Sequence, residues 1–424
     1  MNPVPRYDNP AQGFSEEQFN THSVCQYWRN VENPVPQKPN QDACFKPWIL
    51  KRADGSIDTV VVAVFDGHGK YGHLASTAAR DYLYEYCEFN KERFRDWSAE
   101  DWSQKMTTIF ESMHENIRKI FLKKVQPKPS ETPEGVLLDA SGNFIKGGTT
   151  ATVFVLKGNE DGSFSWVCAN VGDSPASLIC MPKDGNPGSV KQISADHSPL
   201  NVAEWQRMHS EQYRMRPKGP LNSVYEDPEL PCHSPDGVLI NYNNIDFKIK
   251  NLKKERSVYV RDSQTAADST IGLAFTRVLG GFYSQACGIT FVPSVASGDI
   301  PSGVDMRALL YTDGVGDCET QEWSIDRVLQ ITEQQYLLDR CEHSFKGCFN
   351  KANRTFGDTR DDMTMVVLSV SSQVLNPAAA EGSDPAPAAV AEPVFGFMEG
   401  AAAGGPALAP AAAVEDVGPD NASS

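Results

Sequence analysis

The chain has 424 residues, of which 40% are hydrophobic and 22% charged, so it can form a hydrophobic core. Its formal net charge of −16 excludes nucleic acid and anionic membranes as main partners, because both select basic proteins. No apolar run approaches the roughly 18 residues of a membrane span. The first residues also lack the basic and then apolar pattern of a signal peptide. We therefore expect a cytoplasmic monomer, with entry into the nucleus left open.

The ten cysteines form no Cys-x-x-Cys pair, so neither a zinc ribbon nor a redox-active dithiol is expected. Cys168 and Cys180 stand inside apolar, strand-like runs. We expect such cysteines to be reduced and mostly buried.

Composition divides the chain into an arm, one large domain and a tail. The N-terminal residues are rich in Pro, Asn and Gln, and we expect 1–20 to be a loose arm. No linker or repeat interrupts 21–375, which we expect to be one domain with a flap insertion at about 200–270. Residues 376–424 are mostly Ala, Gly and Pro, with seven acidic and no basic side chains, a composition that predicts a disordered tail.

The predicted elements alternate between blocks of short strands and pairs of helices. Apolar or alternating runs predict strands at 45–50, 59–65, 151–156, 164–171, 176–181, 190–193, 289–292, 308–312 and 363–370. Helical spacing predicts helices at 72–94, 98–121, 322–331 and 333–354. Ser98 and Asp101 form a capping box at the start of the second helix. This order favours two sheets packed on each other, with helices outside.

Carboxylates stand at the ends of three predicted strands. One strand leads into Asp66, a second leads into Asp313, and Asp361 with Asp362 opens a third. Carboxylates that gather at strand ends repel one another unless a cation lies among them, and oxygen ligands suit Mg²⁺ or Mn²⁺. His68 lies two residues from Asp66, where it can protonate a leaving oxygen. An ordinary Asp-Gly turn explains any one of these positions, but three together favour a metal site.

Gly67, Gly69 and Gly72 also match the dinucleotide-binding pattern Gly-x-Gly-x-x-Gly between a strand and a helix. We reject that reading because Asp66, directly before the first glycine, would repel a pyrophosphate. The helix that follows also leads into another long helix instead of a second parallel strand.

An ordered series of short motifs resembles the metal-dependent Ser/Thr protein phosphatases of the 2C type, the PPM family, over about residues 40–370. The motifs are Phe65-Asp66-Gly67-His68-Gly69, Gly147-Gly148-Thr149-Thr150-Ala151, Ala169-Asn170-Val171-Gly172-Asp173-Ser174, Asp196-His197-Ser198-Pro199, Leu273-Ala274-Phe275-Thr276-Arg277, Tyr311-Thr312-Asp313-Gly314 and Arg360-Asp361-Asp362-Met363-Thr364. The resemblance implies an α+β fold, a four-layer αββα sandwich of two mainly antiparallel β-sheets flanked by helix pairs, with an extended flap.

The resemblance also implies a reaction and a set of metal ligands. Asp66 would bridge two Mg²⁺ or Mn²⁺ ions, the Gly67 carbonyl would bind one, and Asp313 and Asp361 would bind the other. A metal-bridged hydroxide would attack phosphoserine or phosphothreonine directly, without a phosphoenzyme, and His68 would be the general acid. Phosphorylated proteins would be the substrates, and the chain would act in signalling.

Further positions are implied around these ligands. Asp42 and Gln41 would hold metal-bound water, and Asp173 and Asp317 match positions linked to a third metal ion. Many family members carry Glu where this chain has Gln41, and an Arg that binds phosphate has no equivalent, although Lys38 could supply a charge there. Asp362 and Gly281 replace a usual Asn and Asp, and we interpret Gly281 as a structural change.

Three functions therefore stay open. The first is an active protein phosphatase, which the complete set Asp66, Gly67, Asp313 and Asp361 favours. The second is a catalytically weak pseudophosphatase that serves as a scaffold, which Gln41 and the missing Arg favour. The third is a phosphohydrolase of small molecules on the same fold. Within the flap, the basic run 248–256 is either a solvated loop or a contact for acidic or phosphorylated substrates.

Overall fold

The apolar sequence of β4 (Ile57–Phe65) accounts directly for its buried position in the fold. It is rich in β-branched and other apolar residues, and all nine of its residues are buried. It lies in a five-stranded antiparallel sheet with the order β17-β10-β9-β4-β3. The other strands are β3 (Ala43–Lys51), β9 (Ala151–Gly158), β10 (Phe164–Val171) and β17 (Ser294–Ile300). A strand buried on both faces needs a covering layer on each side.

A six-stranded antiparallel sheet covers one face, in the order β1-β2-β19-β18-β11-β12. Its strands are β1 (Gln12–Gln18), β2 (His22–Val31), β11 (Ala176–Pro182), β12 (Ser189–Gln192), β18 (Val304–Tyr311) and β19 (Met363–Ser372). Side chains of both sheets form one apolar core between them, with Val62, Phe154, Leu310 and Val366 among its members.

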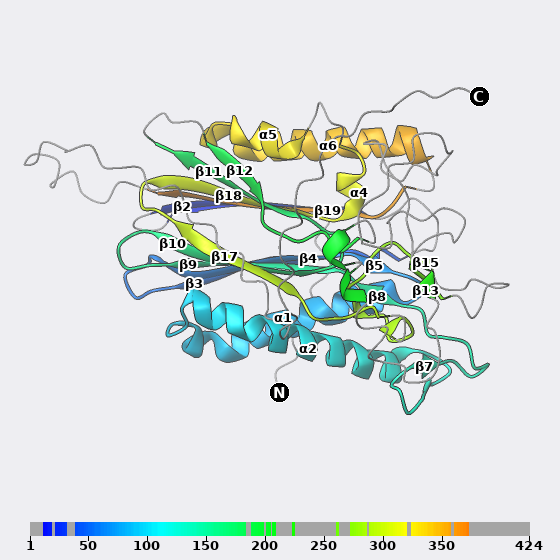
Figure 1. Cartoon of the computed structure of the whole chain (residues 1–424). Coiled ribbons are helices and arrows are strands. Elements are labelled where there is room, and N and C mark those ends of the chain that lie inside the picture. The colour runs from blue at the N-terminus through cyan, green and yellow to red at the C-terminus, as the bar shows by residue number, and fades with distance from the viewer. Residues whose placement is uncertain are drawn as a thin grey trace, which may run out of the picture.

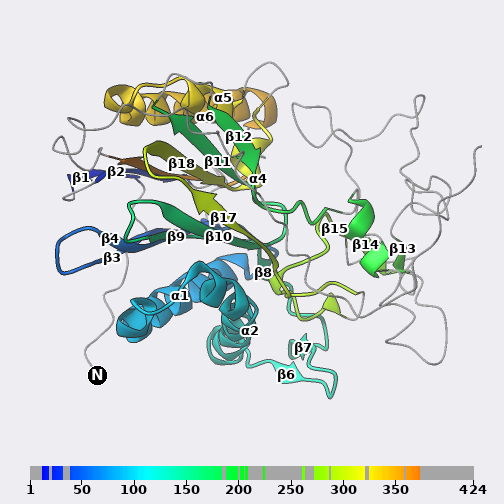
Figure 2. The same ribbon diagram turned by 60° about the vertical axis from the view of Figure 1, so that its left-hand side comes forward.

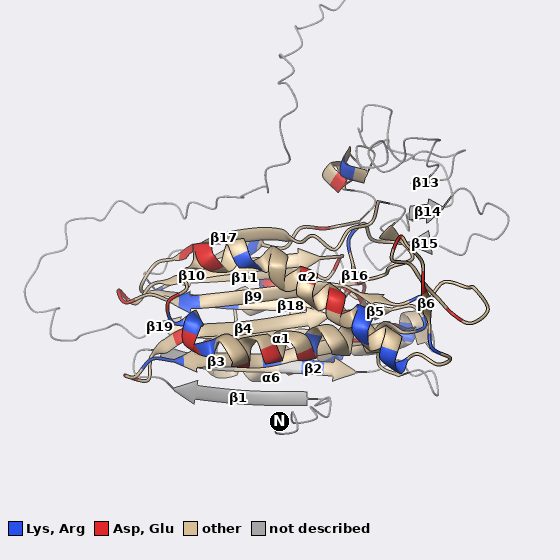
Figure 3. Ribbon diagram, turned by 90° about the horizontal axis from the view of Figure 1, so that it is seen from below, with Lys and Arg blue, Asp and Glu red and all other residues tan. Residues whose placement is uncertain are grey.

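Helices cover the outer face of each sheet (Figure 1). α1 (Gly72–Phe94) and α2 (Ala99–Lys124) pack on the five-stranded sheet. α5 (Ile325–Gln330) and α6 (Leu337–Phe356), with the 3₁₀ turn η3 (Gln334–Tyr336), pack on the six-stranded sheet. The predicted four-layer αββα sandwich is therefore confirmed. Charges of both signs are spread along α1 and α2 (Figure 3), as expected of helices with one solvated face.

Short elements lie at one end of the sandwich. The single turn α4 (Asp313–Gly316) follows β18, and β5 (Gly67–His68), β8 (Gly148–Thr149) and β16 (Leu279–Gly280) form a small sheet. A second small sheet contains β13 (Ser223–Val224), β14 (Val260–Asp262) and β15 (Gly272–Leu273) and lies at the same end (Figure 2). β6 (Ser130–Glu131) pairs with β7 (Leu137–Leu138).

The structure, a computed structural model, describes residues 12–18, 22–31, 39–183, 188–198, 201–204, 206–208, 223–224, 260–262, 272–285, 288–319, 324–357 and 360–372. Most of the predicted flap and the basic run 248–256 lie outside these residues, as does the whole predicted tail, 376–424. Among the described residues, no helix combines the length and apolar character needed to cross a membrane. Cys168, which is buried, and Cys180 are free thiols, as are Cys44, Cys87, Cys318, Cys341 and Cys348.

Most predicted elements are present, and two expectations need correction. The capping box is confirmed, because Ser98 accepts from the Asp101 amide while the Asp101 carboxylate accepts from the Ser98 amide. Residues 12–18, expected in a loose arm, form β1, whose backbone pairs with β2. The strand expected at 289–292 is instead β17, at 294–300. Gly298 in this edge strand lies against Trp166, whose ring would lie 3.0 Å from a Cβ there, so a glycine interrupts the apolar pattern of the strand.

Candidate active site

Strand pairing explains why distant carboxylates meet. Ala43, which begins β3, pairs with Phe65, which ends β4, so Asp42 and Asp66 lie at the same end of the five-stranded sheet. In the other sheet Tyr311 at the end of β18 pairs with Met365 near the start of β19. Asp313 and Asp361 therefore lie beside each other as well. α4, β5 and β8 mark this end of the sandwich in Figure 1.

The carboxylates are close enough to perturb one another. Asp66 and Asp313 share a side-chain hydrogen bond, and burial together with the charges of Asp313, Asp42 and Asp361 raises the pKa of Asp66 well above its usual range. Burial also raises the pKa of Asp42, and Asp362 and Asp361 raise it further. Asp42 is 3% exposed, whereas Asp361 is exposed to solvent. Burial and mutual repulsion thus both favour the protonated form of Asp66 and Asp42.

Two threonines hold Asp42 in place. Thr312 and Thr364 each donate a hydroxyl hydrogen bond of 2.8 Å to Oδ2 of Asp42. The Thr364 amide in turn donates to the Thr312 hydroxyl at 3.0 Å within the six-stranded sheet. The two bonds to Asp42, which directly precedes β3, link the two sheets at this point. Sequence reasoning missed both threonines, because a Thr at the end of a strand is also an ordinary strand residue.

Asp362, which opens the same predicted strand as Asp361, also contributes to the site. Its Oδ2 accepts a hydrogen bond of 2.8 Å from the Gln41 amide, and its own amide donates to Oδ1 of Asp361 at 2.9 Å. Asp362 is 2% exposed. It therefore ties the segment before β3 to the segment before β19.

The glycines of the two Asp-Gly pairs permit close backbone contacts. A Cβ on Gly314 would lie 2.0 Å from the Asp362 carbonyl oxygen, and one on Gly67 would lie 2.3 Å from the Gln41 carbonyl oxygen. Gly72 also packs against Gly67 and the Gln41 side chain. These contacts give Gly67 and Gly72 a packing role in the loop between β4 and α1, which is why their match to a dinucleotide pattern is misleading.

His68 lies beside the carboxylates in a partly buried position. Burial lowers the pKa of His68 to about 4, and the nearby Asp173 carboxylate opposes that shift. Its Nε2 is buried and has no hydrogen-bond partner among the described residues. The ring packs against Phe275, with centroids 4.3 Å apart. The structure therefore brings Asp173, predicted only as a third-metal position, next to His68.

The remaining predicted positions lie around this centre. Asp317 follows α4, one turn after Asp313, and its amide donates to the Asp313 carbonyl at 2.7 Å. The Gln41 side-chain amide donates to the Gly69 carbonyl, so this residue braces the β5 loop. Gly281 has a φ of +57°, which supports the interpretation of a structural change. Lys38 lies outside the described residues.

The chemistry of the cluster suits hard divalent cations. Asp42, Asp66, Asp313 and Asp361 offer carboxylate oxygens, and the carbonyl of Gly67 lies in the same loop as Asp66. Within the described parts of the chain, no three His, Cys, Asp or Glu side chains already stand at metal-ligand spacing. The residues therefore fit a metal site by donor type and charge, and metal binding would draw them together.

Comparisons with known proteins agree with this picture. The family model described as "Protein phosphatase 2C" matches residues 33–353, more than half of the chain. The Arabidopsis thaliana protein "Probable protein phosphatase 2C 72" is 26% identical over 77% of this chain and 81% of its own length. "Probable protein phosphatase 2C 6" from the same plant is 24% identical over 68% of this chain, which spans about half, 53%, of that relative.

A solved serine-threonine phosphatase 2C from Toxoplasma gondii is 13% identical, with a TM-score of 0.49 over 85% of this chain and 100% of that one. The catalytic domain of the serine threonine protein phosphatase PstP, solved with two manganese ions, is 16% identical, with a TM-score of 0.44 over 83% of this chain and 100% of that one. On the extent of the family match, this chain belongs to the protein phosphatase 2C family of serine/threonine protein phosphatases.

Proposed function

We propose that this chain is an active, divalent-metal-dependent phosphatase that removes phosphate from phosphoserine and phosphothreonine in proteins. The observation that carries the proposal is the meeting of carboxylates from both sheets, with Asp66 from one and Asp313 and Asp361 from the other. Family membership supports the reaction class. The repulsion among these carboxylates supports a need for cations.

Asp66, Asp313 and Asp361, with the Gly67 carbonyl, would hold two Mg²⁺ or Mn²⁺ ions in this proposal. Asp42 would orient water near them from its place between Thr312 and Thr364. When bound, such ions supply positive charge to the phosphoryl oxygens and lower the pKa of the attacking water. Asp173 and Asp317 are further candidates for a third ion.

His68 would supply the proton for the leaving group. As the oxygen of water bonds to phosphorus, the bond between phosphorus and the serine or threonine oxygen breaks. That leaving oxygen takes a proton from an imidazole nitrogen of His68, and the proton lost by the water passes to solvent. His68 must be protonated for this step, and both Asp173 and the negative charge of a phosphate ester favour the imidazolium.

Hydrolysis of a phosphothreonine peptide by the purified full-length chain tests the proposal, with Mn²⁺, with Mg²⁺ and with EDTA in parallel. We expect phosphate release with metal, none in EDTA, and a loss of at least about 100-fold in the Asp313→Asn variant. Release that is unaffected by EDTA would contradict the proposal.

The same experiment separates the alternatives. A pseudophosphatase scaffold would release no phosphate with either metal. A phosphohydrolase of small molecules would cleave free phosphate esters but not the peptide.

A further inference from the structure

The imidazole of His68 packs closely against two neighbours. A Cβ on Gly148 would come within 2.8 Å of Nε2 of His68. The ring of Phe275 lies 4.3 Å from the imidazole between centroids and is inclined to it by 51°. Phe275 is itself buried, with 7% of its surface exposed. These two contacts restrict the orientations that the imidazole can adopt.

Phe275 is held in turn by its neighbour Thr276, which is bonded on several sides. The Thr276 amide donates to the His197 carbonyl at 2.7 Å, and its hydroxyl donates to the same oxygen at 2.9 Å. The hydroxyl also lies 2.7 Å from Oε2 of Glu204, to which it can donate. The Thr276 carbonyl accepts from Arg207 at 3.0 Å.

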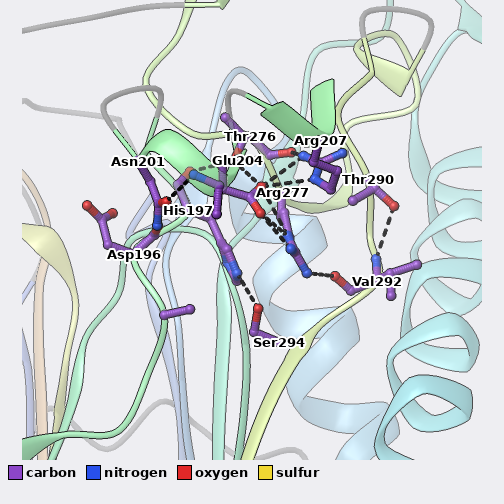
Figure 4. A network of polar contacts seen from close by, with 12 residues as sticks. Asp196, His197, Asn201, Glu204, Arg207, Thr276, Arg277, Thr290, Val292 and Ser294 are labelled. Carbon is purple, nitrogen blue, oxygen red and sulfur yellow. Dashed lines mark hydrogen bonds and ion pairs between the residues drawn. The ribbon is translucent and has the colours of Figure 1, made fainter. Parts of the chain in front are cut away.

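Glu204 is the centre of this network at the base of the flap (Figure 4). Its carboxylate is only 3% exposed and accepts from Nε of Arg277 at 3.1 Å and from Nη2 of Arg207 at 2.8 Å. Arg277 also donates to the Val292 carbonyl at 3.0 Å. Breaking the ion pairs between a buried carboxylate and two guanidinium groups costs much free energy. Glu204 therefore fixes the position of the 276–277 segment.

A second route leads from the same network to His68. The His197 ring accepts the Gly172 amide at Nδ1, 3.1 Å away, and its Nε2 contacts the Ser294 hydroxyl at 2.8 Å. Gly172 precedes Asp173, whose charge acts on His68. His197 therefore holds the loop that carries Asp173, while its own carbonyl holds Thr276.

We propose that Phe275 is a positioning residue for His68, and that Glu204, by binding Thr276 and Arg277, holds Phe275 against the imidazole. This inference rests on the proposed function, because it gives Phe275 a purpose only if His68 donates a proton. Neither residue touches the substrate in this proposal. Their effect is to orient the His68 imidazole so that its proton points toward the leaving oxygen.

Two aryl phosphates with different leaving groups test the proposal on the full-length chain with Mn²⁺. Phenolate is a strongly basic leaving group that needs a proton as the P–O bond breaks, whereas 4-nitrophenolate leaves readily without one. Complete loss of a general acid lowers the rate roughly 100-fold or more. Because Phe275→Leu misplaces His68 without removing it, we expect a smaller loss, about tenfold in kcat for phenyl phosphate. The same variant should lower kcat for 4-nitrophenyl phosphate less than about twofold.

Further variants make the pattern specific. Phe275→Tyr keeps an aromatic ring against His68 and should behave like the wild type. Glu204→Gln should lower kcat for phenyl phosphate but not for 4-nitrophenyl phosphate, and it tests the proposal even if Phe275→Leu fails to fold. Combined with His68→Ala, Phe275→Leu should add no further loss, because the two residues act as one unit. Phe164→Leu is the matched control, since Phe164 is also buried and lies at the far end of β10 from Asp173.

The outcomes are distinct. An equal loss on both esters, or additive losses in the double variant, would overturn the role of Phe275 while leaving the proposed function intact. If the wild-type chain releases phosphate from neither ester nor phosphopeptide, the proposed function itself fails and this inference fails with it.

Discussion

Removing one carboxylate from the site should stabilise the metal-free protein. In Asp313→Asn the side chain keeps its size but loses the charge that, together with burial, raises the pKa of Asp66. A carboxyl whose pKa is higher in the folded than in the unfolded state favours folding when protonated. That stability is fully present below the ordinary pKa of Asp and is lost as the pH rises through the raised value. The gain from the variant should therefore appear at pH 8 and vanish near pH 4.

The size of the effect follows from the charge separation. Two unit charges about 4 Å apart interact with about 4 kcal/mol at an effective dielectric constant of about 20. The hydrogen bond between Asp66 and Asp313 lets a proton relieve much of this repulsion. We therefore expect a gain of about 1 to 2 kcal/mol, or an increase of about 1 to 3 °C in Tm for a domain of this size.

Thermal unfolding of the full-length chain in EDTA, and again with Mn²⁺, measures this effect. Mn²⁺ at 100 times its Kd should stabilise the wild type by about 2.7 kcal/mol, and Asp313→Asn should lose most of that increase. Asp58→Asn is the matched control, because Asp58 is 4% exposed but lies 2.8 Å from Lys157. Its loss should destabilise by about 3 to 5 kcal/mol. If Asp313→Asn destabilises the metal-free protein as Asp58→Asn does, the inferred repulsion is wrong.

Two more substitutions test the geometry around the carboxylates. Thr312→Val removes a hydrogen bond to buried Asp42 and leaves the Thr364 amide unpaired, so denaturant unfolding should show a loss of about 2 to 4 kcal/mol. Thr312→Ser, which keeps the hydroxyl, should lose less than half of that, and an equal loss would refute the hydrogen-bond argument. Gly314→Ala places a Cβ 2.0 Å from the Asp362 carbonyl oxygen, so we expect turnover to fall at least about tenfold with reduced Tm. Unchanged turnover and Tm would show that the loop shifts freely.

The carboxylates were predictable from the sequence because each follows or opens an apolar strand. Val60 to Phe65 could only be a buried strand, and a polar residue at its end had to lie at the rim of a sheet. Strand pairing, which places Asp42 beside Asp66, depends on contacts between distant segments and leaves no local pattern.

Other parts of the site could not be predicted for the same reason. Phe275 appears in the sequence only as one residue of a motif, yet its ring faces His68 from more than 200 positions away. Glu204 belongs to no pattern that marks it in the sequence, and only the folded chain shows that it is buried beside Arg277. In the edge strand β17, Gly298 interrupts the apolar pattern because it lies against the large ring of Trp166.

The repulsion in the site also bears on the choice between enzyme and scaffold. A scaffold without metal would gain stability by replacing Asp66 or Asp313 with a neutral residue, and nothing in binding a partner would oppose that change. Gln41, the main departure that favours a scaffold, has a structural reason to be an amide, because its NH₂ group donates to the Gly69 carbonyl. A Glu there would place a carboxylate oxygen against that carbonyl, where neither atom can donate. The departure is thus compatible with the proposed catalysis, and the repulsion among the carboxylates supports the proposed need for cations.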